Sequence, residues 1–344
     1  MRYPEFLPKN GTIGFIAPSF GCAEGVYLAS FESAERKLSS LGYRIVEGPN
    51  ARAAEGIGIS STPEKCGAEA EHFLTCPGID AVISCGGGEL MCETLDFISF
   101  ERLKKEKPRW FMGFSDNTNL TFLLATLCDT ASVYGPCAPA FGMHPWHQVC
   151  YDALGLLSGG RNVIRSYGTW QGPGDELKDE EHPLAPYHTV RRTRLHRYPE
   201  GPGALTMRGR LIGGCLDCLV NLAGTEYDRV PEFCRNYESD GILWFFECCD
   251  LNVFDMERAL WHLLHCGWFR KPAGFLVGRP LHFGEASMGL DQYKAVLDIL
   301  SRFEVPVIMD IDLGHLPPSM PLLTGAIADV HCAGNQLEIR FTRK

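Results

Sequence analysis

The sequence predicts an α/β fold in which helices cover both faces of a parallel sheet. Apolar segments of strand length alternate with amphipathic segments of helix length, beginning with 12–19 and 31–43. The strand segments are continuously apolar, which is typical of strands buried on both faces. Ligands bind beyond the carboxyl ends of such strands, and Gly86–Gly88 and Ser115 both lie at such ends.

Each expected element of the N-terminal part has a local signal. The segment 12–19 is an apolar strand that ends at Pro18 and Ser19, and the amphipathic helix 31–43 is closed by Gly42. Further strands are expected over 43–48, 79–88, 110–114 and 131–136, and further helices over 63–76 and 118–128.

The periodic pattern lapses between about 150 and 205, where glycine, proline and charged residues dominate. We therefore expect an N-terminal α/β domain over 1–150, a linker or long loop excursion over 151–205, and a C-terminal domain over 206–344. In the C-terminal domain, strands are expected over 241–247, 273–280 and 305–315, and helices over 252–267 and 289–303.

Composition narrows the classes of partner. The chain of 344 residues is 45% hydrophobic and 22% charged, as in an ordinary globular protein. Its net charge of −10 argues against nucleic acid or an anionic membrane surface as a partner. The first residues lack the apolar core of a signal peptide, and no segment approaches the ~20 apolar residues that span a bilayer. We expect a cytoplasmic enzyme.

The fifteen cysteines do not have metal-site spacing. Only Cys215 and Cys218 form a C-x-x-C pair, and no second pair stands at zinc-ribbon spacing. Most of the others lie within apolar runs, where reduced thiols pack as small hydrophobic groups. The histidines lack carboxylate or cysteine partners at ligand spacing. No metal site and no cofactor are expected.

The segment WFMGFSDNT, 110–118, turns from an apolar strand directly into a helix. Ser115 therefore lies at the carboxyl edge of a strand and at the N-terminus of a helix. Serine, aspartate and asparagine are preferred helix caps, so this turn has an ordinary structural explanation. It also resembles the nucleophile elbow G-x-S-x-G, except that Asn117 replaces the second glycine. From these residues alone, both interpretations stay open.

Two further strand ends carry residues that a serine nucleophile needs. Glu247 ends the apolar segment GILWFFE, where a carboxylate is costly unless it has a partner. His315 ends VPVIMDIDLGH, ahead of a proline-rich corner. A histidine takes the proton of the serine hydroxyl, and an acid fixes the histidine tautomer. Alternatively, Glu247 pairs with an arginine and His315 with a carbonyl group.

The glycine run 86–88 ends another strand and lets backbone N–H groups approach an anion. A phosphate is disfavoured because Glu89 follows the run and no Walker lysine is present. An oxyanion hole formed by the N–H groups of Gly87 and Asp116 fits better. The rival of another class is a non-catalytic ligand-binding α/β protein that uses Gly86–Gly88 as an anion nest.

Taken together, these motifs resemble the LD-carboxypeptidase family of serine peptidases, which includes the microcin C self-immunity hydrolases. The resemblance covers about residues 11–330 and is carried by IGFIAPS, CGGG at 85–88, GFSDNT at 113–118, GRLIGG at 209–214, the strand that ends in Glu247, and GHLPP at 314–318.

The resemblance implies an N-terminal parallel α/β domain of the Rossmann or flavodoxin-like type and a C-terminal swivelling β/β/α-type domain. It also implies a cytoplasmic homodimer without metal. Carried over residue by residue, Ser115 is the nucleophile, Glu247 the acid and His315 the base, with Gly87 and Asp116 as oxyanion donors.

Two substrate classes follow from the resemblance: the L-residue–D-alanine bond of murein peptides, and aminoacyl conjugates of a nucleotide analogue. Trp170, in the long excursion, is the candidate to stack on a base; alternatively, it is a loop aromatic that folds onto its own domain. Glu89 stands where the immunity branch tends to carry asparagine, so the murein peptide is favoured. Candidate substrate-binding residues are Gly88, Glu89 and Trp170, and a cluster that can receive a carboxylate or simply form a solvated surface, Arg191, Arg192 and Arg194.

Overall fold

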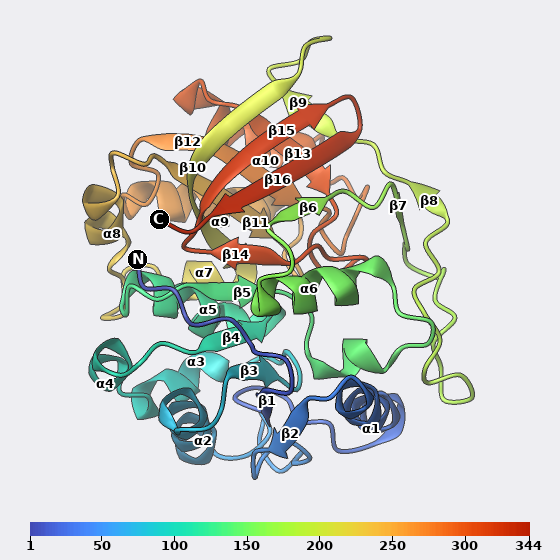
Figure 1. Cartoon of the computed structure of the whole chain (residues 1–344). Helices are drawn as coiled ribbons and strands as arrows, with labels where there is room; N and C mark the ends of the chain where they lie inside the picture. Colours follow the sequence, from blue (N-terminus) through green and yellow to red (C-terminus); the bar gives the residue numbers. More distant parts are fainter. The chain divides into compact units, whose positions relative to one another are not determined.

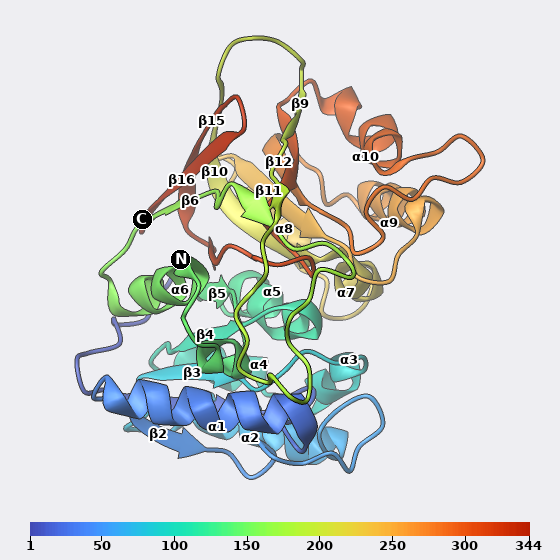
Figure 2. The same ribbon diagram turned by 90° about the vertical axis from the view of Figure 1, so that its right-hand side faces the viewer.

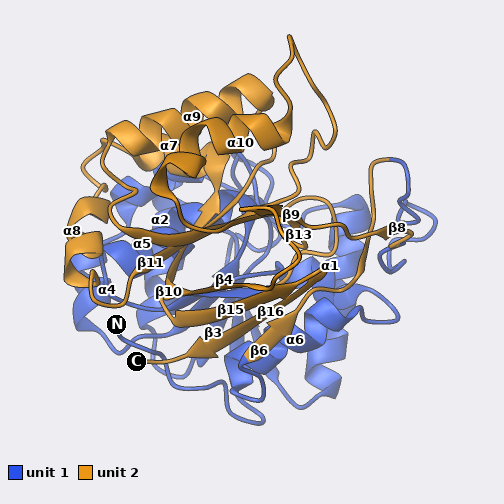
Figure 3. Cartoon of the chain, turned by 90° about the horizontal axis from the view of Figure 1, so that it is seen from above, with its two compact units in different colours: residues 1–162, 174–188, 321–324 blue, residues 163–173, 189–320, 325–344 orange.

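The chain folds into two units, each with its own central sheet, in the computed structural model of residues 1–344 (Figure 3). Unit 1 consists of Met1–Asn162, Gly174–His188 and Pro321–Thr324. Unit 2 consists of Val163–Pro173, Thr189–Met320 and Gly325–Lys344. None of the helices has the length and apolar character needed to span a membrane.

The sheet of unit 1 has six strands in the order β14-β5-β4-β3-β1-β2 (Figure 1). The neighbouring strands from β2 to β5 are parallel, whereas β14 pairs antiparallel with β5. These strands are β1 (Thr12–Ile16), β2 (Arg44–Glu47), β3 (Ala81–Ser84), β4 (Trp110–Gly113), β5 (Ser132–Tyr134) and β14 (Leu322–Thr324). The parallel α/β prediction is confirmed.

Helices cover both faces of this sheet. Successive strand residues point to opposite sides, and those of β1, β3 and β4 are buried at every position, so both faces carry apolar side chains that need a cover. Ile16 and Phe111 pack in one apolar cluster with residues of the helices on one face. On the other face, Phe15 packs against Phe31 of α1 with ring centroids 5.3 Å apart, and Figure 2 shows α1 lying along this side. The helices of unit 1 are α1 (Gly25–Ser40), α2 (Pro63–Thr75), α3 (Met91–Thr94), α4 (Phe100–Lys105), α5 (Thr118–Thr126) and α6 (Gln148–Ser158), with short 3₁₀ turns at η1 (Leu95–Phe97), η2 (Ser115–Asn117) and η3 (Ala138–Gly142).

The sheet of unit 2 has eight strands in the order β6-β16-β15-β10-β11-β12-β13-β9. Its centre, β10 to β13, is parallel, and antiparallel strands flank it on both sides. The strands are β6 (Val163–Arg165), β9 (His196–Tyr198), β10 (Leu205–Cys215), β11 (Ile242–Glu247), β12 (Pro272–Gly278), β13 (Val307–Ile311), β15 (Ile327–Ala333) and β16 (Gln336–Thr342). A separate pair is formed by β7 (Thr169–Trp170) and β8 (Arg191–Arg192).

The helices of unit 2 are α7 (Leu216–Leu222), α8 (Val230–Asn236), α9 (Val253–His265) and α10 (Gln292–Leu300), followed by the 3₁₀ turn η4 (Ser301–Phe303). Asn252 caps α9 by accepting from the N–H groups of Phe254 and Asp255, and Asp291 caps α10. The helices expected over 252–267 and 289–303 therefore begin where a side-chain acceptor is available.

The two units differ from the expected ranges 1–150, 151–205 and 206–344. The segment 151–205 is not one linker: it contains part of α6, and it is divided between the units. Its residues 163–165 pair with β16, whereas 174–188 are held to unit 1, for example by the N–H of His144, which donates to the carbonyl of Leu184 at 2.8 Å. Long-range pairing of this kind leaves no periodic pattern in the sequence.

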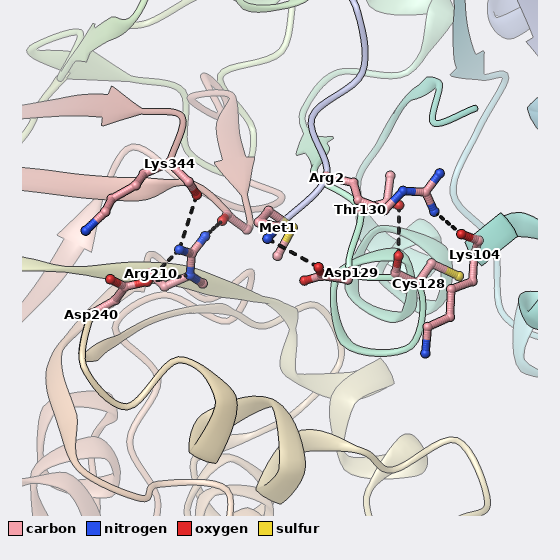
Figure 4. A network of polar contacts seen from close by, with 10 residues as sticks. Met1, Arg2, Lys104, Cys128, Asp129, Thr130, Arg210, Asp240 and Lys344 are labelled. Carbon is pink, nitrogen blue, oxygen red and sulfur yellow. Dashed lines mark hydrogen bonds and ion pairs between the residues drawn. The ribbon is translucent and has the colours of Figure 1, made fainter. Parts of the chain in front are cut away.

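Both units anchor chain ends with polar contacts (Figure 4). In unit 1, the N-terminal amino group of Met1 lies 3.2 Å from Asp129, and the guanidinium of Arg2 donates to the carbonyl of Lys104. In unit 2, the buried Arg210 pairs with Asp240 and donates to the carbonyl of Lys344 at 3.3 Å. These contacts fix the N-terminus within unit 1 and the C-terminus within unit 2.

Candidate active site

Ser115 adopts a strained backbone conformation between β4 and α5. Its φ of 63° lies in the left-handed region, which few residues other than glycine adopt. The N–H of Ser115 donates to the hydroxyl of Tyr134 at 3.0 Å, and Tyr134 is fully buried on β5. Non-glycine residues in such a conformation cluster at functional sites, because surrounding contacts must impose the strain.

Asn117 links the Ser115 turn to the glycine run. Its side-chain amide donates to the carbonyls of Gly86, at 2.7 Å, and Phe114, at 3.1 Å. A β-carbon on Gly113 would lie 2.7 Å from Asn117 Cγ, so the side chain of Asn117 requires glycine at position 113, four residues earlier. The residue that departs from the G-x-S-x-G pattern thus connects the two predicted parts of the site in unit 1. Sequence reasoning noted the departure but did not predict the link.

Gly87 lies directly against Ser115. A β-carbon on Gly87 would be 2.9 Å from Ser115 Cβ and 3.0 Å from its Oγ, so a side chain here would collide with the hydroxyl group. The carbonyl of Gly87 accepts from the N–H of Phe20 at 2.9 Å. The turn is therefore fixed on one side by Phe20 and stands next to the serine on the other.

The side chain of Asp116 is buried and hydrogen-bonded within unit 1. It accepts from the hydroxyl of Ser19 at 2.6 Å, from the N–H of Met91 at 2.9 Å and from the amide of Asn119 at 3.0 Å. Burial raises the pKa of Asp116, and these hydrogen bonds partly offset that rise. Its carboxylate thus fixes the turn, and the predicted oxyanion role concerns only its backbone N–H.

Gly88 and Glu89 complete the glycine turn. The glycines lie beyond the strand expected over 79–88, because β3 ends at Ser84. A β-carbon on Gly88 would lie 2.2 Å from Ser19 Oγ, so Gly88 allows the glycine turn and the Ser19 loop to pack closely. Glu89 is exposed, and its N–H donates to the carbonyl of Gly58 at 3.0 Å. Their predicted contacts with substrate stay predictions.

Glu247 and His315 come together in unit 2. Glu247 ends β11 and is fully buried, and its Oε2 lies 2.7 Å from Nδ1 of His315. The expected strand end at His315 is wrong: β13 ends at Ile311, and a loop carries His315. Asp310, inside β13, has a φ of 62° where the pairing with β12 shifts register, and Gly314 in the loop has a φ of 107°.

Two glycines allow this loop to approach the carboxylate. A β-carbon on Gly314 would lie 3.0 Å from both Cβ and Oε2 of Glu247. A β-carbon on Gly278, at the end of β12, would lie 2.3 Å from the carbonyl oxygen of Leu313. Both positions therefore require glycine for the histidine to reach its partner.

The environment of His315 favours its charged form. Burial lowers the pKa of His315, but the charge of Glu247 and hydrogen bonds with Cys249 and Glu247 outweigh burial and raise the pKa well above its usual value. Burial raises the pKa of the Cys249 thiol, and the hydrogen bond with His315 opposes that rise. A carboxylate that holds Nδ1 leaves Nε2 of the neutral ring as the atom that accepts a proton.

A buried ion pair anchors the base of the histidine loop, and sequence reasoning missed it. Arg279 pairs with Asp312 at 2.6 Å and donates to the carbonyl of Asp310 at 2.7 Å. Asp312 also accepts from the N–H of Tyr167 at 2.6 Å and from the hydroxyl of Thr193 at 3.0 Å. The available signal was the presence of charged residues inside two otherwise apolar strand segments.

Trp170 is 5% exposed and packs within unit 2. Its ring contacts Phe283, with centroids 5.0 Å apart, and the guanidinium groups of Arg191 and Arg279, at 5.3 and 4.9 Å from its centroid. Of the arginine cluster, Arg191 thus has an aromatic partner. Whether the ring also meets a substrate stays a prediction.

None of the fifteen cysteines forms a disulfide bond. No group of three or more histidine, cysteine, aspartate or glutamate side chains is arranged to hold a metal ion.

Comparison with known families identifies the family of this chain. Residues 13–135 match the LD-carboxypeptidase N-terminal domain, and residues 208–330 match the LD-carboxypeptidase C-terminal domain. The chain belongs to the LD-carboxypeptidase family. The predicted family is therefore confirmed, and it is a family of serine peptidases.

Curated relatives of this family include both predicted branches. A putative carboxypeptidase of Vibrio cholerae is 24% identical over 93% of this chain and 92% of the relative. The microcin C7 self-immunity protein MccF of Escherichia coli is 24% identical over 93% and 90%. The murein tetrapeptide carboxypeptidase of Pseudomonas aeruginosa is 22% identical over 90% and 89%.

Solved structures confirm the fold. A MccF-like protein of Bacillus anthracis superimposes with a TM-score of 0.80 at 19% identity, covering 99% of this chain and 100% of that protein. MccF in complex with glutamyl sulfamoyl guanosine superimposes with a TM-score of 0.79 at 21% identity, covering 98% of each chain. At this identity, the likeness establishes the fold and not the substrate.

Proposed function

We propose that this protein is a serine amide hydrolase of the LD-carboxypeptidase type, which releases a terminal D-amino acid from murein-type peptides. The observation that carries the proposal is the strained Ser115, held in the left-handed region with its hydroxyl against Gly87. A helix cap needs neither feature, since capping residues have ordinary extended backbone. A nucleophile needs both, because its hydroxyl must stand clear of the strand end and next to an oxyanion site.

In the proposed reaction, Ser115 Oγ attacks the carbonyl carbon of the scissile amide while His315 Nε2 takes the hydroxyl proton. The developing oxyanion is held by the N–H groups of Gly87 and Asp116. His315 then gives the proton to the leaving nitrogen, and an acyl-serine ester forms as the C–N bond breaks. Water attacks this ester by the same route, releasing the acid and restoring Ser115.

Glu247 has the supporting role in this scheme. Its contact of 2.7 Å with Nδ1 of His315 selects the tautomer with Nε2 unprotonated, and its charge stabilises the imidazolium that forms during attack. The scheme requires Nε2 of His315 to come within hydrogen-bond reach of Ser115 Oγ in the active protein. The expected homodimer and cytoplasmic location stay predictions.

A direct substrate comparison tests the proposal. Purified protein is offered a murein tetrapeptide, the same peptide with a C-terminal D-alaninamide, and an aminoacyl-sulfamoyl adenosine. We expect release of D-alanine from the free acid and much slower cleavage of the amide, since a carboxypeptidase holds the terminal carboxylate. Cleavage of the adenosine conjugate alone would assign the protein to the immunity branch instead.

Two variants complete this test. Because Trp170 is buried, Trp170→Phe is preferred to an alanine variant, and it should leave D-alanine release nearly unchanged. Ser115→Ala should lose turnover by several orders of magnitude. Binding of these peptides by the wild-type protein without any turnover would favour a non-catalytic ligand-binding protein.

A further inference from the structure

The C-x-x-C motif of Cys215 and Cys218 has no part in the proposed reaction. β10 ends at Cys215, which is buried, and α7 begins at the next residue and carries Cys218, which is partly exposed. The first turn of α7 brings the two side chains to the same side, and their thiols are hydrogen-bonded to each other. Thiols in such contact need only a small movement to form a disulfide bond.

Two ordinary explanations do not account for this pair. It is not part of a metal site, since no third histidine, cysteine or carboxylate side chain is arranged with it as a ligand. Packing as a small hydrophobic group explains the buried Cys215 but not Cys218, which solvent reaches. A partly exposed thiol in contact with a buried thiol is instead typical of a redox-active C-x-x-C pair, in which the accessible sulfur reacts first.

Asp217, between the two cysteines, supplies a base for such a reaction. Cys215 Sγ donates to Oδ2 of Asp217 at 3.3 Å. Contact with Cys218 and burial, together with two nearby carboxylates, raise the pKa of the Cys215 thiol well above its usual value. This thiol therefore stays protonated until it reacts, and the carboxylate that already accepts its proton can take that proton during the attack.

We propose that Cys215 and Cys218 are a redox site, which closes to a reversible disulfide bond when the protein meets hydrogen peroxide. The thiolate of Cys218 attacks one peroxide oxygen, the O–O bond breaks, hydroxide leaves, and a sulfenic acid forms at Cys218. The sulfur of Cys215 then attacks the sulfenic sulfur while Asp217 takes the thiol proton. The S–O bond breaks, and the hydroxyl group leaves as water with that proton. The two sulfurs lose two electrons, which the peroxide gains.

The same carboxylate connects the redox site with the proposed catalytic pair in unit 2. Asp217 accepts from the N–H groups of Cys249, at 3.0 Å, and Asp250, at 2.8 Å, in the turn that follows β11. The thiol of Cys249 is hydrogen-bonded to His315. Closing the disulfide removes the Cys215 donor from Asp217 and shifts the residues between the two cysteines. Resting on the proposed function, oxidation is therefore expected to displace His315 and to lower turnover.

Peptide mapping tests the disulfide without any measurement of activity. The reduced full-length protein is treated with hydrogen peroxide, its remaining thiols are blocked with N-ethylmaleimide, and it is digested with trypsin. Cleavage after Arg210 and Arg229 yields a peptide whose only cysteines are Cys215 and Cys218. After peroxide, we expect this peptide to carry no maleimide and to be lighter by two hydrogen atoms, and dithiothreitol should restore both thiols. Two blocked thiols after peroxide, or a disulfide from either cysteine to Cys249, would overturn the proposal.

Two serine variants separate this pair from the other thiols. Cys218→Ser should form no disulfide in the mapped peptide, and before oxidation it should keep the wild-type turnover, because the side chain is partly exposed. Cys266→Ser is the matched control: Cys266 is another partly exposed thiol of unit 2, and its sulfur lies 3.6 Å from Nε2 of His262. This control should form the Cys215–Cys218 disulfide as the wild type does.

Asp217→Asn tests the assignment of the base. A general base contributes roughly 10²-fold or more, so loss of the carboxylate should slow closure of the disulfide by about that factor. Sulfenic acid at Cys218 should then accumulate, and dimedone traps it for mass spectrometry. Closure at the wild-type rate, with no trapped sulfenic acid, would overturn the role of Asp217.

Release of D-alanine from a murein tetrapeptide measures the connection with His315. Since a displacement of about 1 Å can cost roughly 10²-fold in rate, kcat should fall by roughly 10- to 100-fold on oxidation and return with dithiothreitol. Peroxide-treated Cys218→Ser should stay active, and its equal inactivation would overturn the connection, as would full turnover by the oxidised wild type. If the reduced protein cleaves no peptide, the hydrolase proposal fails, while the mapped peptide still decides for or against the disulfide.

Discussion

Replacing Ser115 by glycine should make unit 1 more stable than replacing it by alanine. Both variants lose the hydroxyl group, so both should be inactive by several orders of magnitude. They differ in the backbone: alanine keeps the β-carbon that makes a φ of 63° unfavourable, and glycine removes it. Ordinary residues pay roughly 1–2 kcal/mol in this region, and glycine loses part of that advantage through its greater freedom when unfolded.

The net difference is expected to be about 1 kcal/mol in favour of Ser115→Gly. Urea denaturation of the two variants, followed by tryptophan fluorescence, measures it as a shift in the transition midpoint. Because the chain has two units, the variants are compared on the same transition and not by an extrapolated total.

The control is a substitution by glycine that should lower the free energy of unfolding. Ala29 lies inside α1, where a glycine costs about 1 kcal/mol relative to alanine. Ala29→Gly should therefore be less stable than the wild type, while Ser115→Gly is more stable than Ser115→Ala. If Ser115→Gly proves the less stable of the Ser115 pair, the left-handed elbow is wrong, and the main structural support for the nucleophile is lost.

Three further predictions concern unit 2 and the chemistry. In Glu247→Gln, kcat should fall by roughly 10³–10⁴-fold with little change in KM. Glu247 raises the pKa of His315 against the opposing effect of burial, so the variant should lower that pKa. The rising limb of the pH–kcat/KM profile should then move to lower pH, and an unmoved limb would contradict the pairing. Gly314 and Gly284 have φ values of 107° and 80°, so replacing either by alanine should cost roughly 1–2 kcal/mol of stability. Only Gly314→Ala should lose activity, because a β-carbon there meets Glu247, whereas nothing lies within 4 Å of a β-carbon on Gly284. Activity should survive chelators in full, and a loss restored by zinc would contradict the serine mechanism.

The ion pair between His315 and Glu247 also makes the stability of the fold depend on pH. The pKa of His315 is raised in the folded protein, because the attraction of Glu247 outweighs the opposing effect of burial. The charged pair therefore stabilises the fold fully below about pH 6.5, the value for an unfolded histidine, and this contribution is lost as pH rises through the higher folded value.

Local patterns were sufficient to predict the elements that surround the site. The apolar runs before Ser115 and Glu247 became buried strands, because a segment covered on both faces needs continuous apolar residues. The proline-rich corner after His315 was recognised, but its destination was not. Leu322–Thr324 returns to unit 1 and pairs with β5, and three residues carry no signal for a partner almost 190 positions away in the chain.

Buried polar partners were beyond the reach of pattern reasoning for a related reason. Arg279 and Asp312 are 33 positions apart, and each looks like an interruption of an apolar strand until the other is beside it. Tyr134 likewise appears as an ordinary strand residue, although its hydroxyl accepts the N–H of the strained serine. Such partners depend on which strands become neighbours, and strand order is a property of the whole sheet.

Glycine connects these observations in both units. Next to Ser115, a β-carbon on Gly87 would press on the hydroxyl, and next to Glu247, a β-carbon on Gly314 would press on the carboxylate. In each case, the missing side chain leaves room for a polar group that must stand close to another backbone. From the sequence, the first glycine appears as part of an anion-binding run and the second as the end of a strand. Their common requirement, close approach to a proposed catalytic side chain, becomes visible only when strand ends that are distant in the chain are brought together.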